Sequence, residues 1–220
     1  MSEAESVHAP KYSLWLGARL GVLLYYGGMY YTDPNTGAEE RVSSFVTNGI
    51  APEVDLGARI SRRYIPYLAL ELGFVGPGSR FQGTQATAGT SFVGVGFRFL
   101  MGDTSSVSFA SDLSLGFRKF QVDSGGSTWT ASAFEFLRLG LGADIRFTDY
   151  FTISPMITLS GGSVSDTSGS VKFAPNQSDG AAGTPPPGWA SNNIPGWAQT
   201  SYVSIVIGCG AHFDLLSSHE

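Results

Sequence analysis

The sequence alternates apolar residues with small or polar ones, position by position, in eight separate stretches. In the clearest of them, 137–147, an apolar side chain stands at every odd position from Leu137 to Phe147, and the even positions hold only arginine, glycine and aspartate. An extended strand sends successive side chains to opposite faces. Each stretch therefore predicts a β-strand with one apolar face and one charged or nearly empty face. That pattern is typical of a barrel with lipid outside and polar groups inside.

The spacing of these stretches predicts an up-and-down barrel. The first, third, fifth and seventh connections are long, and the other three are short. Long extracellular loops, short periplasmic turns and an even number of strands are typical of transmembrane barrels, and lipid requires the first and last strands to pair. We therefore expect an all-β fold, an eight-stranded antiparallel transmembrane β-barrel with meander topology. The expected strands cover residues 12–26, 51–62, 67–74, 91–100, 107–120, 137–147, 151–160 and 201–215.

Composition agrees with this fold and excludes other classes. Charged residues make up 14% of the chain, against about a quarter in ordinary soluble domains, and glycine contributes 29 of 220 residues. A net charge of −5 without a basic run argues against a nucleic-acid partner. The single cysteine, Cys209, excludes an internal disulfide and a cysteine-rich metal site.

The pattern predicts one domain. We expect a polar N-terminal segment at 1–11, a barrel at 12–215 that contains a long loop at 161–199, and a tail at 216–220. The first ten residues lack the basic start and apolar core of a secretory signal, so we expect that a signal peptide has been removed from an outer-membrane protein of the Gram-negative type. The apolar stretch 14–31 contains Arg19, four glycines and a two-residue period, which argue against a transmembrane helix.

The polar strand faces place many charges in the expected lumen, six arginines against five carboxylates. Side chains are enough to fill an eight-stranded barrel, and a charge inside is tolerated only if it is paired or hydrated. The first hypothesis is an ion-paired plug that rigidifies the barrel. The second is a narrow polar conduit for small solutes, which the inward glycines favour because they remove wall volume. The residues are Arg19, Glu53, Asp55, Arg59, Glu71, Arg98, Asp112, Arg118, Arg138, Asp144 and Arg146.

Aromatic residues mark the expected loops and strand ends. Trp129, Trp189 and Trp197 stand in polar loops, where they would form a lid, anchor in the membrane interface or bind a partner, and the sequence does not decide among these. Tyrosines favour the headgroup level, where the ring is apolar and the hydroxyl wet. We expect interfacial rings at Tyr25, Tyr26, Tyr30, Tyr31, Tyr64, Tyr67, Tyr150 and Phe151.

The sequence carries no catalytic motif of the kind that such barrels would need. A covalent mechanism requires a nucleophile with a neighbouring base, and the three histidines stand before the barrel (His8), at the periplasmic end of the last strand (His212) and in the tail (His219). Residues with metal-ligand spacing are also missing. We therefore expect no enzyme activity, no cofactor and no metal. In the seventh expected strand, Pro155 removes a ladder donor, and we expect a β-bulge there.

The chain resembles the small outer-membrane β-barrel superfamily of the OmpA/OmpX/OmpW kind. The resemblance is one of pattern over 12–215, and residues 210–215 (GAHFDL) are similar to the signal by which such barrels are recognised for assembly. It implies a monomeric barrel in outer-membrane lipid, porin-like in architecture, that acts as a structural or binding barrel or as a narrow small-solute channel. One alternative is a soluble lipocalin-like barrel that binds an apolar ligand. Another is a surface adhesion barrel that meets its partner through the loops.

Overall fold

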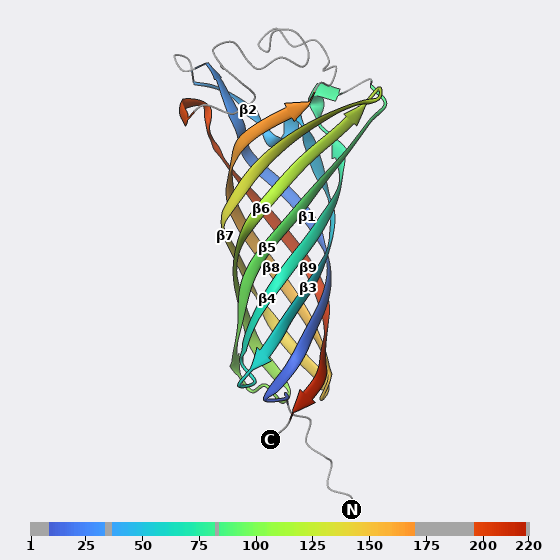
Figure 1. Cartoon of the computed structure of the whole chain (residues 1–220), viewed down its shortest axis with the longest axis vertical. Helices are drawn as coiled ribbons and strands as arrows, with labels where there is room; N and C mark the ends of the chain where they lie inside the picture. Colours follow the sequence, from blue (N-terminus) through green and yellow to red (C-terminus); the bar gives the residue numbers. More distant parts are fainter. Residues whose placement is uncertain (1–8, 34–36, 82–83, 170–195, 219–220) are drawn as a thin grey trace, which may run out of the picture.

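The computed structural model describes residues 9–33, 37–81, 84–169 and 196–218. Within these residues eight long strands form one closed antiparallel barrel, shown in Figure 1. Each strand pairs with its neighbour in the chain, and β1 pairs with β9 to close the sheet, so the predicted meander barrel is confirmed. The strands are β1 (Tyr12–Asp33), β3 (Val46–Ile60), β4 (Tyr64–Pro77), β5 (Ala86–Gly102), β6 (Val107–Ser124), β7 (Ser127–Thr148), β8 (Phe151–Gly169) and β9 (Ser201–Ser218).

Four short elements lie at one end of the barrel, which we call the loop end. A short strand, β2 (Ala38–Arg41), extends the sheet beside β1, and three 3₁₀ helices follow as η1 (Val42–Ser44), η2 (Ser79–Phe81) and η3 (Gly196–Ala198). The opposite end, called the turn end, holds the short β3–β4, β5–β6 and β7–β8 connections and the pairing of Tyr12 with Ser218. In Figure 1 the long strands run from the turn end up to the loop end.

The strands are longer toward the loop end than the sequence predicts. The fifth connection, expected to be a loop, is a two-residue turn at Gly125 and Gly126 with φ of 59° and 80°. Positive φ at both turn residues is what a tight hairpin needs, and glycine meets it without strain. The eighth strand runs to Gly169, so the loop expected at 161–199 begins later, and its part from 170 to 195 lies outside the described residues.

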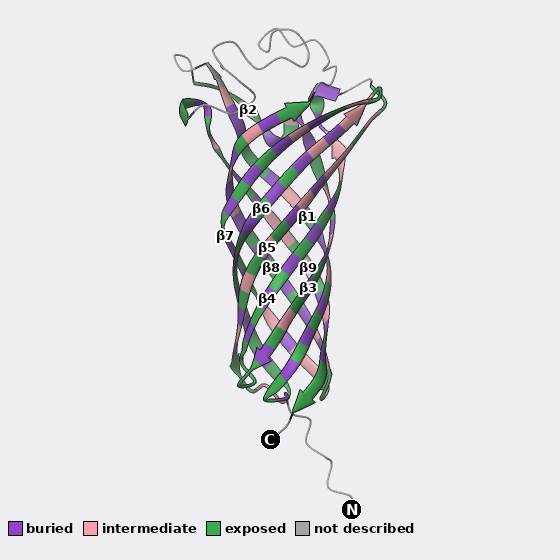
Figure 2. Cartoon of the chain, in the orientation of Figure 1, coloured by how far each residue is buried: buried purple, intermediate pink, exposed green. Residues whose placement is uncertain are grey.

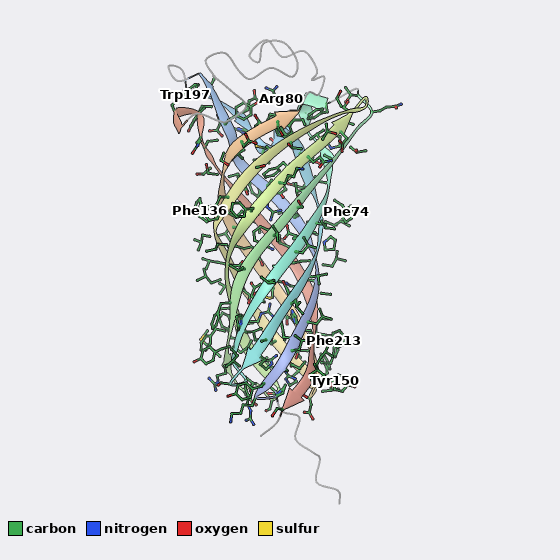
Figure 3. All side chains as sticks on the ribbon, viewed as in Figure 1. Phe74, Arg80, Phe136, Tyr150, Trp197 and Phe213 are labelled. Atoms are coloured by element: carbon green, nitrogen blue, oxygen red, sulfur yellow. The ribbon has the colours of Figure 1, made fainter. Side chains whose placement is uncertain are left out.

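Side chains alternate between an apolar outer wall and a filled lumen. On β4, Leu70 is 50% exposed and its neighbour Glu71 is 0% exposed, and Figure 2 shows the same alternation of buried and exposed positions along every long strand. In Figure 3, Phe74 and Phe136 project from the wall at one level, and Tyr150 and Phe213 project near the turn end. The exposed wall is apolar and the charges are inside, which is the reverse of a lipocalin-like barrel and leaves lipid as the solvent for the wall.

The expected ring of interfacial tyrosines is partly wrong. Tyr26, Tyr64 and Tyr150 are exposed on the wall, but Tyr25, Tyr30 and Tyr67 are buried in the lumen. Neighbouring tyrosines in an extended strand cannot share a face, so Tyr25 and Tyr26 necessarily point in opposite directions.

The expected bulge at Pro155 is also absent. Pro155 pairs directly with Cys209, and the ladder between β8 and β9 runs through it without a register shift. The described part of the chain contains no helix that is long and apolar enough to cross a membrane.

Candidate functional site

The lumen is the candidate site, because the structure places all eleven predicted charged residues inside it. Nine of them are buried, and the side chains of the other two, Arg19 and Arg146, are 10% and 4% exposed. The structure joins them into a continuous chain of ion pairs, with a smaller separate group at the turn end. The chain runs through Asp144, Arg98, Asp112, Arg19, Asp55, Glu53, Arg138, Glu71, Arg118 and Glu135.

The part of the chain nearest the turn end is built on Arg98 of β5. Arg98 donates from Nε and Nη2 to the two carboxylate oxygens of Asp112, at 2.7 and 2.9 Å. Asp112 lies opposite Arg98 in the β5–β6 ladder, so the sheet register itself presents the carboxylate to the guanidinium. The indole ring of Trp15 covers one face of Arg98, with Cζ 5.1 Å from the ring centroid. A fork of two bonds and an aromatic cover replace the water that this cation loses on burial.

The middle of the chain is held by Arg19, which reaches across the lumen from β1. It donates to Asp55 from Nε and Nη2 at 2.9 and 3.2 Å, and it also donates to Glu53. Arg19 Nη1 lies 3.4 Å from Asp112 Oδ2. One guanidinium therefore links acidic residues of β3 and β6 across the interior.

Arg138 joins two carboxylates that the sheet places side by side. Glu53 and Glu71 are direct partners in the β3–β4 ladder, and two negative charges at that separation repel each other. Arg138 Nη2 donates to both, at 2.5 Å to Glu53 and 2.6 Å to Glu71. The ring of Phe92 lies against the same guanidinium, with Cζ 4.6 Å from its centroid. Without Arg138 the two buried carboxylates would face each other without the cation between them.

Arg118 closes the chain toward the loop end. It donates at 2.8 Å to Glu71 and at 2.5 Å to Glu135. Glu135 also accepts a bond from the Tyr202 hydroxyl at 3.0 Å, and Arg118 donates to the Tyr25 hydroxyl at 3.0 Å. The ion pairs thus end at the hydroxyl groups of two tyrosines.

A separate charged group closes the turn end. Asp214 accepts from Arg59 at 2.7 Å, from Arg146 at 2.8 Å and from the Ser13 hydroxyl at 2.6 Å. Arg59 and Arg146 therefore do not belong to the main chain of ion pairs.

Two lumen carboxylates are missing from the sequence-based set. Glu135 lies on the part of β7 that the sequence analysis assigns to a loop, and Asp214 is an inward residue of the last strand. With these two, the chain of ion pairs and the group at the turn end together contain seven carboxylates and six arginines. Extending the two-residue period backward from Leu137 would place Glu135 on the outward face. The bulge between Glu135 and Leu137 shifts the alternation, so that Phe136 and Leu137 are both exposed and Glu135 is buried.

Large side chains pack into the space beside several of the inward glycines. Phe92 covers Gly94 and Gly116, and a Cβ built on either glycine would lie within 2.8 Å of its ring. Tyr67 covers Gly96 in the same way, and Met156 covers Gly142. The wall volume that glycine removes is therefore occupied by rings and a thioether that shield the ion pairs.

This packing makes a testable prediction at Gly116. A Cβ at this position would lie 2.2 Å from the Val93 carbonyl oxygen and 2.6 Å from Gly94 Cα. We expect Gly116→Ala to lower the free energy of unfolding by about 1–3 kcal/mol through overpacking, measured by urea unfolding in lipid vesicles. Gly89→Ala is the matched control, since its Cβ would meet only the Gly73 carbonyl oxygen at 3.6 Å. Equal stability of the two variants would contradict the close approach of β5 to Gly116.

An apolar core fills the lumen at the loop end, above the ion pairs. Its residues are Leu23, Tyr25, Met29, Tyr30, Val42, Phe45, Val46, Ala51, Phe81, Phe120, Val122, Trp129, Ala131, Ala133, Val164, Ala198 and Tyr202. Phe45, which follows η1, stacks on Trp129 of β7 with ring centroids 4.5 Å apart. Arg80 of η2 lies over the Phe45 ring, with Cζ 5.2 Å from the ring centroid, and pairs with Glu40 at 2.7 Å. We call this cluster the loop-end core.

The two candidate tryptophans that the structure describes have different environments. Trp129, expected in a loop as a lid or binding residue, lies in β7 and is 6% exposed within the loop-end core. Trp197 lies in η3 and is 40% exposed at the loop end, where Figure 3 labels it. Trp189 lies outside the described residues.

One cluster in the lumen has the residue types of a hydrolase but not the arrangement. The Ser154 hydroxyl donates to Asp144 at 2.5 Å and lies 2.9 Å from His212 Nδ1. In a catalytic triad the imidazole stands between the serine and the carboxylate and takes the serine proton. Here the serine stands in the middle and its single proton goes to the carboxylate, so the imidazole is the donor to Ser154. Among the described residues no group of three or more His, Cys, Asp or Glu side chains is arranged to hold a metal ion.

Comparison with known proteins identifies the fold. No protein-family model matches the sequence, and no curated protein sequence matches it. Neisserial surface protein A (NspA) is 10% identical with a TM-score of 0.56, and the match covers 93% of this chain and 99% of that one. The outer-membrane protein OprG of Pseudomonas aeruginosa is 13% identical with a TM-score of 0.46 and coverages of 94% and 98%. Ail of Yersinia pestis is 12% identical with a TM-score of 0.41 and coverages of 91% and 99%.

The match to NspA is the one of these three that supports a fold assignment, and at 10% identity it concerns the fold alone. The chain has the fold of the small eight-stranded outer-membrane β-barrels. Together with the apolar wall and the charged lumen, this fold makes the chain an outer-membrane protein.

Proposed function

We propose that this outer-membrane barrel is a closed, non-catalytic scaffold that acts through its loop end and not through its lumen. The observation that carries the proposal is that two sets of side chains fill the lumen at two different levels. Ion pairs capped by aromatic rings occupy the middle, and the loop-end core lies above them. A conduit needs a continuous wet path, whereas these buried charges take their partners from one another.

The scaffold proposal favours the plug hypothesis over the small-solute channel. It also leaves the loop end as the surface that can meet another molecule, in agreement with the general use of loops on a rigid framework. Trp197 is the described residue that supports this most directly, because a large apolar ring stands 40% exposed there. Exposed aromatic rings are frequent anchors of protein–protein contacts.

Single-channel recording tests the proposal. We expect the wild-type protein, reconstituted in planar bilayers under high salt, to show no steady conductance above the bare bilayer. Arg19→Ala and Arg98→Ala serve as probes, because both side chains lie in the chain of ion pairs. A stable wild-type pore whose ion selectivity changes in either variant would overturn the proposal.

A further inference from the structure

A groove on the outer wall lies where β4, β5 and β6 run side by side, at the loop-end margin of the apolar wall. Its volume is about 360 Å³. The outward face of β5 forms the floor with small residues, Thr87, Gly89 and Ser91. The two sides differ in chemistry, with Leu72 and Phe74 of β4 on one side and Lys119, Gln121 and Asp123 of β6 on the other.

The sheet register fixes how the two sides face each other. Ser91 lies between Leu72 and Lys119 in the ladder, and two residues further along β5, Gly89 lies between Phe74 and Gln121. Each row therefore passes from an apolar side chain, over a small one, to a polar one. Gly89 has no side chain and so leaves the floor of the groove open. A Cβ at this position would make only an ordinary van der Waals contact, so there is room for a side chain.

Lys119 brings a positive charge to this groove. It is exposed, and it has no hydrogen bond or ion pair within the described residues. Two positions toward the turn end on the same face, Phe117 is 66% exposed and belongs to the apolar wall. The ammonium group therefore stands at the boundary between acyl chains and headgroups, where lysine attracts anionic lipid.

Asp123 does not neutralise Lys119 by direct contact. Its carboxylate accepts bonds from the Thr128 hydroxyl at 2.5 Å and the Gln121 amide at 2.9 Å. The carboxylate is thus directed toward the β6–β7 turn, and Lys119 is left facing the membrane.

We propose that this groove binds one phosphate-bearing lipid of the surrounding leaflet. The phosphate lies against Lys119 and the hydroxyl of Ser91, and an acyl chain follows Leu72 and Phe74 down to the apolar wall. Charge complementarity at Lys119 and the continuity of the groove with the wall together select a lipid over a soluble anion. The proposal concerns the outer wall and is independent of whether the lumen conducts.

Native mass spectrometry of the full chain released from nanodiscs tests the proposal. The nanodiscs contain phosphatidylcholine mixed with phosphatidic acid. We expect Lys119→Gln to lower the preference for bound phosphatidic acid about fivefold, which corresponds to about 1 kcal/mol per lysine at a membrane surface. Gly89→Leu fills the groove and is expected to remove the bound lipid of either kind.

Two matched controls separate this site from general effects of charge and bulk. Lys11→Gln removes a lysine at the turn end, next to Tyr12. Gly161→Leu adds the same side chain on the wall at another glycine with room for a Cβ, whose nearest atom lies 3.6 Å away. Both controls are expected to bind lipid as the wild type does. Equal binding by Lys119→Gln and wild type, an equal loss in Lys11→Gln, or displacement of the lipid by inorganic phosphate would each overturn the proposal.

Discussion

Replacing Arg138 with methionine is expected to lower the free energy of unfolding of the barrel by about 3–5 kcal/mol, the cost of breaking a buried ion pair by removing one partner. Methionine keeps much of the volume of the side chain, so the change removes charge more than packing. Arg138 donates to both Glu53 and Glu71, which are ladder partners. Its loss leaves two facing carboxylates buried in the lumen, each with one remaining arginine. Reversible urea unfolding in lipid vesicles, followed by tryptophan fluorescence, measures the change.

Arg146→Met is the matched control for this prediction. Arg146 pairs with a single carboxylate, Asp214, at the turn end, where Arg59 also holds it. The control is therefore expected to cost much less than the change at Arg138. In the double variant Arg138→Met/Glu53→Gln, one of the two facing charges is gone, and part of the lost stability should return. Additive effects of the two substitutions would contradict direct coupling between Arg138 and Glu53.

The two-residue period was sufficient to predict the barrel and the direction of the lumen charges. It places Arg98 and Asp112 on inward faces, and the ladder then makes them direct partners. The period does not say which charges meet across the lumen. The link from Arg19 to Asp112 depends on the tilt and closure of the barrel, which no local pattern records.

The loop-end core was missed for a different reason. Residues around Trp129 are polar enough, with glycine, serine and threonine, to read as a loop, yet the two-residue period continues through them. Phe45 lies between a 3₁₀ helix and a strand, so it has no periodic neighbours that would mark it as buried. Its partner, Trp129, is far away in the sequence, and the two rings stack only because the fold brings β7 next to Phe45. Glycine content does not give the free volume of the lumen for a similar reason, since the sequence shows the missing side chain but not the ring that packs beside it.

Removing the Phe45 ring is expected to weaken the loop-end core strongly while leaving the ion pairs in place. Phe45 is fully buried and stacks on Trp129, and truncation of a buried phenylalanine to alanine costs about 3–5 kcal/mol. The loss should appear as local opening, because η1 and η2 are joined through this residue. The Gly78 amide donates to the Phe45 carbonyl at 2.8 Å, and hydrogen exchange at Gly78 therefore reports the opening directly.

The control for Phe45→Ala is a phenylalanine on the outer wall, and the outcomes that would contradict the prediction concern the ion pairs below the loop-end core. Phe136→Ala removes a ring of the same size from the outer wall, where Phe136 is exposed to lipid, and should leave exchange at Gly78 unchanged. In Phe45→Ala, amides beside the ion pairs, such as that of Glu71, should keep the protection of the wild type. Faster exchange there would mean that the loop-end core and the ion pairs form one cooperative unit.

We expect Phe45→Ala to show no steady conductance in planar bilayers, because Arg138 and its partners still fill the lumen below the loop-end core. A steady conductance in this variant would show that the loop-end core alone closes the barrel.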